Sequence, residues 1–379
     1  MCHQDVCRTG RRLGLAVLAG LLLGAAPLRA QVVIAVSGGG AALANAVAGA
    51  PSGATLVVAN GLYSGFSVID KDLTIVGNPR ATVEGPIEAP AGATVRKLRL
   101  SNLDVVNAPS PTSPGFVPGR ILVVGNLQAF DCTCMALGVG TFGATLNQCW
   151  LERTTVHGSH LPNVVLGDAT FIDCSLQGAP TLASVFPPSA QNGVFVVGSL
   201  RAERTAIASS SGANPGSAAA LMLWGPGTLA NCVLNIGAAG SSGLTGTGSV
   251  TLWSTTIASP QLPTTTRLLA TAEWNQRNWT VGGASQAAFR EAPNALVLVV
   301  ISTGIARWNT PLAAEPLWIG SGNDWGIWSV GVTDGQGLHV QNVAIPNVPA
   351  LRYSQAWLTG VFVDPLPLRS TASIGGTIL

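Results

Sequence analysis

Four charged side chains occupy the same position of a sequence repeat, and their types and spacing could support chemistry on a sugar. They are Asp131, Arg153, Asp173 and Arg204, which follow one another at intervals of 22, 20 and 31 residues and alternate in sign. If the repeats stack as rungs about 4.8 Å apart, the four side chains form one outward stripe. In a polysaccharide lyase, acidic side chains hold calcium against a sugar carboxylate and an arginine removes a proton from the sugar. These four residues are therefore the candidate catalytic residues.

The spacing of this stripe also limits the chemistry that it could perform. Asp131 and Asp173 would lie two rungs, or about 9.6 Å, apart, with Arg153 between them. Calcium needs oxygen ligands at about 2.3–2.6 Å, so the separation disfavours a calcium site, and no metal site is predicted. The same separation lies at the edge of the range of about 6.5–9.5 Å for the two carboxyls of an inverting glycosidase. The alternative is a ladder of ion pairs that secures the register of the rungs, worth about 0.2–1 kcal/mol per exposed pair.

Glu152 and Glu203 form a second pair of interest, because each begins a Glu-Arg-Thr triplet. Strict alternation along a strand would turn both side chains inward, where an unpaired carboxylate is costly. We therefore expect the strand to bend before them, so that they face water at a corner. If they are buried instead, they become candidates for raised pKa values and for function.

The repeat that carries these residues extends from residue 69 to residue 258. Its eight centres are Leu73, Leu103, Cys132, Thr154, Cys174, Thr205, Cys232 and Thr255. The residue two positions after each centre is apolar, and the residue directly before each centre is polar or charged. Such alternation predicts strands with one buried and one exposed face. Intervals of 20 to 31 residues between centres predict a solenoid whose rungs stack on one another.

The first turns of this solenoid resemble those of a known family. Residues 53–66 read GATLVVANGLYSGF and residues 71–77 read KDLTIVG, which fits the pattern GxTLxVxxGxYxGxxxxxKxLTIxG. A stretch of this kind opens many secreted right-handed parallel β-helix proteins of the pectate-lyase-like superfamily, which residues 40–260 resemble. The resemblance implies an all-β fold built on a right-handed parallel β-helix. It implies no particular activity, because the opening stretch builds the first turns of the coil and carries no chemistry.

The chain divides into four segments by composition and pattern. Residues 1–30 are a predicted signal peptide, in which arginines precede an apolar run of 14 residues, fewer than the roughly 18–20 of a membrane-spanning helix. Residues 31–52 are expected to form a capping helix over the first rung, and residues 53–266 the β-helix. Residues 267–379 are expected to form a small β-sandwich-like module, because short apolar runs alternate with turn residues. We expect an exported protein, secreted or in the cell envelope, with no transmembrane segment after signal cleavage.

Composition narrows the range of partners. Without the leader the chain carries 15 basic and 16 acidic residues, a net charge of about −1, which offers no basic surface for nucleic acid or anionic lipid. Five cysteines remain, and alternate rungs lie beyond disulfide reach. We interpret them as small buried hydrophobes and not as disulfides or metal ligands. They are Cys132, Cys134, Cys149, Cys174 and Cys232.

Tryptophans offer a separate candidate site, because seven of the ten lie beyond residue 267. Trp325 and Trp328 flank a glycine in a turn-rich segment, where exposed rings could stack on sugars. The alternative is that these rings fill the core of the small module.

Three functions stay open at this point. The first is an exported, non-catalytic β-helix protein that binds polysaccharide or another extracellular or cell-envelope component. The second is a polysaccharide lyase or glycoside hydrolase that acts along the β-helix flank. The third is a purely structural or adhesive surface protein. No cofactor is expected, except calcium if the protein is a lyase.

Overall fold

The computed structural model describes residues 32–89, 97–109, 116–117, 119–139, 148–158, 163–165, 167–178, 192–210, 218–237, 242–274, 279–308, 310–313, 317–319, 325–363 and 366–379. The predicted signal peptide lies outside these ranges. Within them, no helix is both long enough and apolar enough to cross a membrane. The chain forms two compact units, Gln31–Arg267 and Leu268–Leu379.

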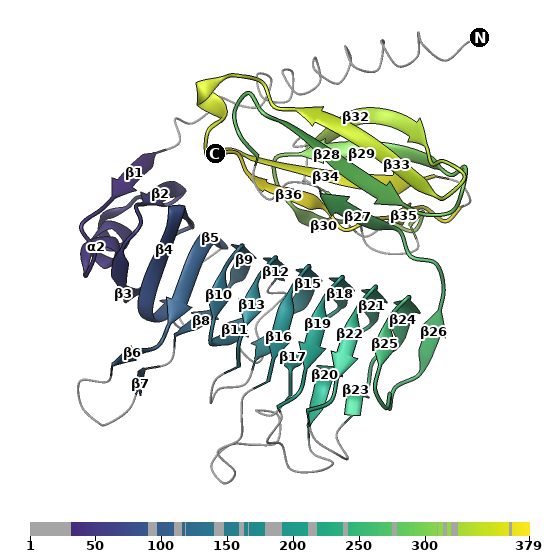
Figure 1. The fold of residues 1–379 in the computed structure, drawn as a ribbon, viewed down its shortest axis with the longest axis horizontal. Helices are drawn as coiled ribbons and strands as arrows, with labels where there is room; N and C mark the ends of the chain where they lie inside the picture. The colour runs from purple at the N-terminus through teal and green to yellow at the C-terminus, as the bar shows by residue number, and fades with distance from the viewer. Residues whose placement is uncertain are drawn as a thin grey trace. The chain divides into compact units, whose positions relative to one another are not determined.

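The first unit is the predicted parallel β-helix (Figure 1). Its turns contribute short strands to three faces, and equivalent strands of successive turns pair in parallel. The first face consists of β1 (Val33–Val36), β2 (Ala54–Val58), the start of β4 (Leu73–Ala89), the start of β5 (Lys97–Val106), β9 (Asn126–Phe130), β12 (Gln148–Glu152), β15 (Asp168–Ile172), β18 (Leu200–Glu203), β21 (Gly227–Ala230), β24 (Val250–Trp253) and β26 (Thr264–Thr266).

The other two faces repeat this arrangement. The second face consists of the start of β3 (Leu62–Ser67), later parts of β4 and β5, β10 (Thr133–Cys134), β13 (Thr155–Val156), β16 (Ser175–Gln177), β19 (Ala206–Ala208), β22 (Val233–Asn235) and β25 (Thr256–Ile257). The third face consists of the ends of β3 and β4, β8 (Arg120–Val123), β11 (Ala136–Val139), β14 (Val164–Val165), β17 (Val194–Val196), β20 (Ala219–Leu223) and β23 (Ser242–Gly246). Between β5 and β8 in the sequence, β6 (Ala108–Pro109) and β7 (Phe116–Val117) form a short antiparallel hairpin.

The core of the solenoid consists of inward side chains that stack on their equivalents one rung away. Leu98, Leu127 and Cys149 form one such column and are at most 2% exposed. The five cysteines that the structure describes are buried free thiols, as predicted. Burial raises the pKa of the Cys132 and Cys174 thiols to about 12, so both stay protonated at neutral pH.

The alternation of the sequence places the polar position of the repeat within a strand, but in the structure this position lies at a corner. Seven corner residues have left-handed φ angles between +45° and +55°: Asn102, Asp131, Arg153, Asp173, Arg204, Asn231 and Ser254. This conformation turns the chain from the first face to the second. The next side chain then points inward and bonds back to the strand: Cys132 Sγ donates to Phe130 O at 3.2 Å, and Thr154 Oγ1 donates to Glu152 O at 3.2 Å.

The first unit of the repeat is placed differently from the prediction. Leu73 pairs with Leu98 on the first face, whereas Ala81 pairs with Leu103. The predicted centre at Leu73 is therefore wrong, and the equivalent of Leu103 is Ala81. A shift of register between Val76 and Ala81 within β4 separates the two faces and hides this offset in the sequence.

The helix α2 (Ala42–Gly49) supplies the predicted cap and buries Leu43 and Val47. Lys71, which lies between β3 and β4, caps the C-terminal end of this helix. Its Nζ donates to the carbonyl oxygens of Val47, Ala48 and Ala50 at 3.0, 2.9 and 2.9 Å. These are terminal carbonyls that have no partner within a helix.

Lys71→Met is expected to destabilise the cap by about 1–3 kcal/mol, because hydrogen bonds to a charged donor are lost. Urea unfolding followed by circular dichroism measures the loss. Lys71→Arg keeps the cation and should retain a substantial part of the stability. Equal losses in the two variants would show that the ammonium contacts do not stabilise α2.

The second unit is a small β-sandwich. Its strands form a three-stranded antiparallel sheet, a five-stranded sheet and a two-stranded ribbon, with one 3-10 turn, η2 (Pro349–Leu351). The strands are β27 (Thr271–Trp274), β28 (Ala284–Arg290) and β33 (Leu338–Ala344); β32 (Trp325–Val332), β29 (Leu296–Ser302), β34 (Gln355–Phe362), β35 (Arg369–Ser370) and β36 (Ile374–Thr377); β30 (Ala306–Trp308) and β31 (Leu317–Ile319). Phe289, Val299 and Phe362 are fully buried in its main core.

Candidate functional site

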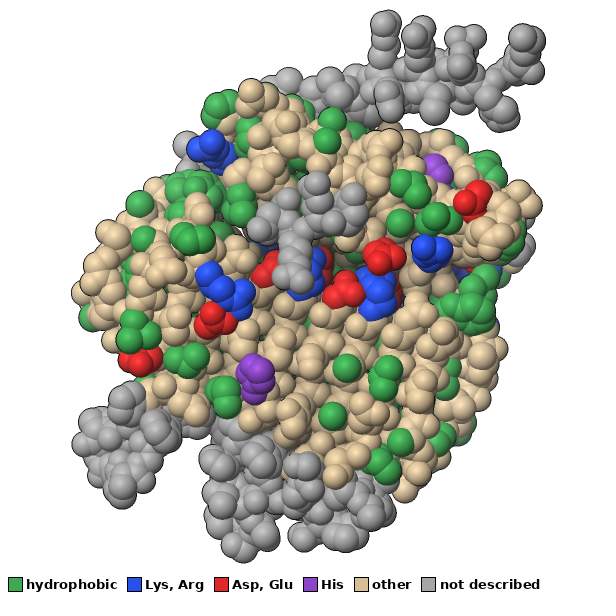
Figure 2. All heavy atoms as spheres, viewed as in Figure 1, with side chains coloured by type: hydrophobic (Ala, Val, Ile, Leu, Met, Phe, Trp, Pro, Cys, Tyr) green, Lys and Arg blue, Asp and Glu red, His purple; other side chains and the backbone are tan. Residues whose placement is uncertain are grey.

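The four predicted catalytic residues lie together on successive corners, where they form two ion pairs. Arg153 reaches back one turn, and its Nε and Nη2 donate to Asp131 Oδ1 and Oδ2 at 2.8 and 3.0 Å. Arg204 binds Asp173 of its preceding turn in the same way, at 2.7 and 3.0 Å. Both oxygens of each aspartate are therefore held by a guanidinium. On the face drawn in Figure 2, acidic and basic side chains of the solenoid lie next to one another.

These pairs also bear on the proposed roles of the side chains. Burial lowers the pKa of Arg153, but the charges of Glu152 and Asp131 outweigh this effect and raise it above its ordinary value. A residue that removes a proton from a sugar needs a pKa near the working pH. The surroundings of Arg153 therefore oppose its use as a base. Across the ranges that the structure describes, no group of three or more His, Cys, Asp or Glu side chains could hold a metal ion.

Glu152 and Glu203 are buried, so the prediction that they face water is wrong. Each is the last residue of a first-face strand, with its side chain on the outer side, and each is 1% exposed. The chain does not bend before them. It turns one residue later, because Arg153 and Arg204 adopt the left-handed conformation.

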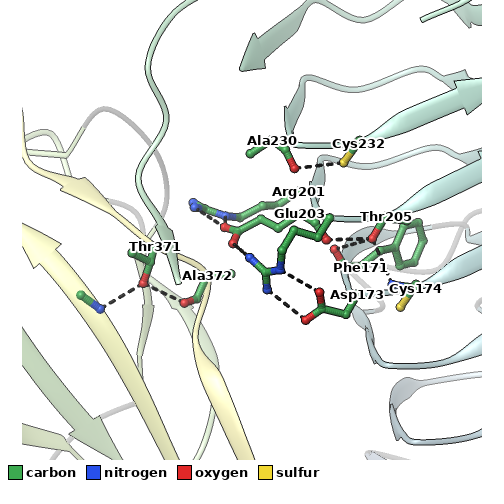
Figure 3. A network of polar contacts seen from close by, with 12 residues as sticks. Phe171, Asp173, Cys174, Arg201, Glu203, Thr205, Ala230, Cys232, Thr371 and Ala372 are labelled. Carbon is green, nitrogen blue, oxygen red and sulfur yellow. Dashed lines mark hydrogen bonds and ion pairs between the residues drawn. The ribbon is translucent and has the colours of Figure 1, made fainter. Parts of the chain in front are cut away.

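The surroundings of Glu203 compensate its charge. Arg201 Nε and Nη2 donate to Glu203 Oε1 at 2.9 and 2.7 Å, and Arg204 Nη1 lies 3.5 Å from Oε2. Figure 3 shows Glu203 beside Arg201. This carboxylate therefore lies between two cations.

The surroundings of Glu152 are less favourable to a charge. Trp150 occupies the column that holds Arg201 two turns later, with Thr170 between them. Glu152 Oε1 accepts from Arg153, which also serves Asp131, whereas Oε2 accepts no hydrogen bond from any residue that the structure describes. Burial is the main cause that raises the pKa of Glu152 to about 7, and Arg153 opposes it. Glu152 is thus the side chain of this group best suited to exchange a proton near neutral pH.

The two tryptophans predicted to bind sugar lie on opposite sides of one strand. The segment is not a turn but strand β32, and residues three apart on a strand point to opposite faces. Trp328 is 7% exposed and belongs to the sandwich core, whereas Trp325 is 36% exposed.

A third tryptophan, Trp308, lies beside Trp325. It belongs to β30, is 48% exposed, and its ring centroid lies 6.5 Å from that of Trp325 at an interplanar angle of 33°. Sequence reasoning missed Trp308 because it belongs to a different strand. The turn-rich sequence around Trp308 did not distinguish it, because several other tryptophans lie in similar segments.

One exposed tryptophan of the solenoid provides a comparison. Trp224 follows β20 and is 46% exposed. Its ring packs edge-on against Phe195, with centroids 5.0 Å apart and an interplanar angle of 71°. Trp308 and Trp325 therefore differ from Trp224 in presenting two partly exposed rings together.

Comparison with known proteins identifies no relative of the chain. No family model, no curated protein and no solved structure matches the chain.

Proposed function

We propose that the protein is an exported, non-catalytic glycan-binding protein and that Trp308 and Trp325 form its binding site. The observation that carries this proposal is the exposure of the two neighbouring rings. Aromatic rings offer large apolar faces at low cost in conformational entropy, and such faces suit the apolar sides of sugar rings. The β-helix serves as a rigid support. Support for export comes from the predicted signal peptide and from the secreted pectate-lyase-like proteins that residues 40–260 resemble.

Trp308→Ala and Trp325→Ala are each expected to weaken polysaccharide binding about tenfold or more. Truncation of an aromatic anchor typically costs about 1.4–2 kcal/mol or more of binding free energy. Affinity electrophoresis against a panel of soluble polysaccharides, followed by calorimetry on those that bind, measures the change. Because both side chains are exposed, the variants should keep the stability of the wild type.

Trp224→Ala is the matched control, since it removes an exposed tryptophan from the solenoid. It should bind like the wild type. A wild-type protein that binds no polysaccharide of the panel would contradict the proposal and favour a structural or adhesive role. Equal weakening in all three variants would contradict the assignment of the site.

A second candidate function is a polysaccharide lyase or glycoside hydrolase with Glu152 as its acid–base group. It is favoured by the pKa of Glu152 near 7, which suits proton transfer at neutral pH. Against it, the residue is only 1% exposed, so its carboxyl is not open to a substrate. Release of reducing ends or unsaturated sugars by the wild type, and not by Glu152→Gln, would establish an enzyme.

A further inference from the structure

We infer that the ligand of the Trp308–Trp325 site is a neutral polysaccharide chain that lies along the outer side of β32. This inference rests on the proposed function and adds to it the class and the direction of the ligand.

The outer side of β32 continues the apolar surface from Trp325. Val299 and Val300 of β29 face Ser329 and Ile327, so Trp328 is an extra residue in a β-bulge. The bulge shifts the alternation and brings later side chains to the side of Trp325. The exposed apolar residues of β32 are Trp325 at 36%, Ile327 at 45%, Val330 at 60% and Val332 at 55%.

The neighbouring strand widens this surface. Val330 pairs with Leu298 and Val332 pairs with Leu296, which is itself 37% exposed. From Trp325 to Val332 the strand runs beside six steps of β29, from Ser302 to Leu296, which cover about 20 Å at roughly 3.3 Å per residue. A single sugar would cover only part of this length, so the surface fits a chain of several sugar units.

The strand also offers polar groups beside its apolar side. Among the described strands, β32 pairs only with β29 and forms the edge of its sheet. Backbone N–H and C=O groups on the open edge lack a neighbouring strand and can bond to other partners. A sugar chain has the same combination, because its rings carry apolar faces and its hydroxyls lie around their rims.

The charge of the two strands selects the class of polysaccharide. Neither β29 nor β32 contains an Asp, Glu, Lys or Arg residue. An acidic polymer laid on this surface would lose hydration of its carboxylates without gaining a cation from either strand. A neutral polymer has no carboxylates to dehydrate, so an uncharged surface favours an uncharged ligand.

The test uses the mature protein with a soluble neutral β-glucan and with polygalacturonate, at low and high salt. We expect the neutral polymer to bind with less than a twofold change between the two salt concentrations. Val330→Asp should weaken this binding at least fivefold, because it places a charge about 13 Å along the strand from Trp325, four steps of the paired strand β29 at roughly 3.3 Å per residue. Val340→Asp is the matched control, since Val340 is 47% exposed on β33 of the other sheet, and it should bind like the wild type.

The outcomes separate this inference from the proposed function. Binding of polygalacturonate alone, weakened by salt and by Trp325→Ala, would overturn the neutral ligand and uphold the site. Equal binding by Val330→Asp and Val340→Asp would overturn the direction along β32. Binding that does not respond to Trp308→Ala or Trp325→Ala would overturn the proposed function itself.

Discussion

Glu152→Gln is expected to stabilise the protein at pH 8 and to leave its stability nearly unchanged at pH 4.5. Burial raises the pKa of Glu152 to about 7 in the folded protein, against an ordinary value of 4.5. Between these values the folded state binds more protons than the unfolded state, so the contribution of Glu152 to stability falls as pH rises. The rise of this pKa from 4.5 to about 7 corresponds to about 3 kcal/mol of unfolding free energy. Glutamine does not titrate, so the free energy of unfolding of the variant should exceed that of the wild type by about this amount once the pH has risen from 4.5 to 8.

Urea unfolding of both proteins at several pH values measures this gain. Glu88→Gln is the control, because Glu88 also binds an arginine, Arg120, but its side chain is 28% exposed. An exposed pair of this kind is worth about 0–1 kcal/mol, so the control should change stability little. A constant difference between Glu152→Gln and wild type from pH 4.5 to pH 8 would contradict the buried, poorly compensated carboxylate.

Arg201→Met is expected to destabilise the solenoid by about 3–5 kcal/mol at pH 8. Arg201 is 6% exposed and donates two hydrogen bonds to Glu203, which is 1% exposed. Its removal takes these two charged hydrogen bonds from Glu203, and Arg204, whose Nη1 lies 3.5 Å from Glu203 Oε2, already binds Asp173. Breaking a buried ion pair from one side costs this much because the other charge stays buried.

The double variant Arg201→Met, Glu203→Leu separates lost charge compensation from lost packing. Replacing both members of a buried pair by apolar side chains is often nearly neutral, so most of the stability should return. Guanidinium unfolding at fixed pH provides the measurement. If the double variant is no more stable than Arg201→Met, loss of packing and not an uncompensated carboxylate causes the effect.

The two Glu-Arg-Thr turns therefore use one triplet in two different ways. In both turns the arginine reaches back to an aspartate of the preceding turn, which ties the turns together in pairs. Only the later turn has a second arginine beside the glutamate, whereas the earlier turn has Trp150 in that column. One residue outside the triplet thus decides whether the carboxylate is compensated.

The architecture of the solenoid could be predicted from the chain because its rungs repeat a local pattern. Apolar and polar residues alternate around each centre, and seven of the eight predicted centres pair in register in the structure, from Leu103 to Thr255. The exception, Leu73, lies at the start of β4, which runs through all three faces without interruption. Alternation alone does not reveal on which face a residue of such a strand lies.

The candidate sites depended on features that no local pattern contains. A left-handed φ at Arg153 and at Arg204 places each corner after the glutamate, so Glu152 and Glu203 are the last residues of their strands; both are 1% exposed. Likewise, Trp325 and Trp328 are close in sequence but lie on opposite faces of β32, whereas Trp308 approaches Trp325 from another strand. The order of residues along the chain therefore reveals strands and their stacking, because these arise from neighbours and repeats. Which side chains share a surface is decided by backbone corners and by contacts between distant strands, and these exist only in the folded protein.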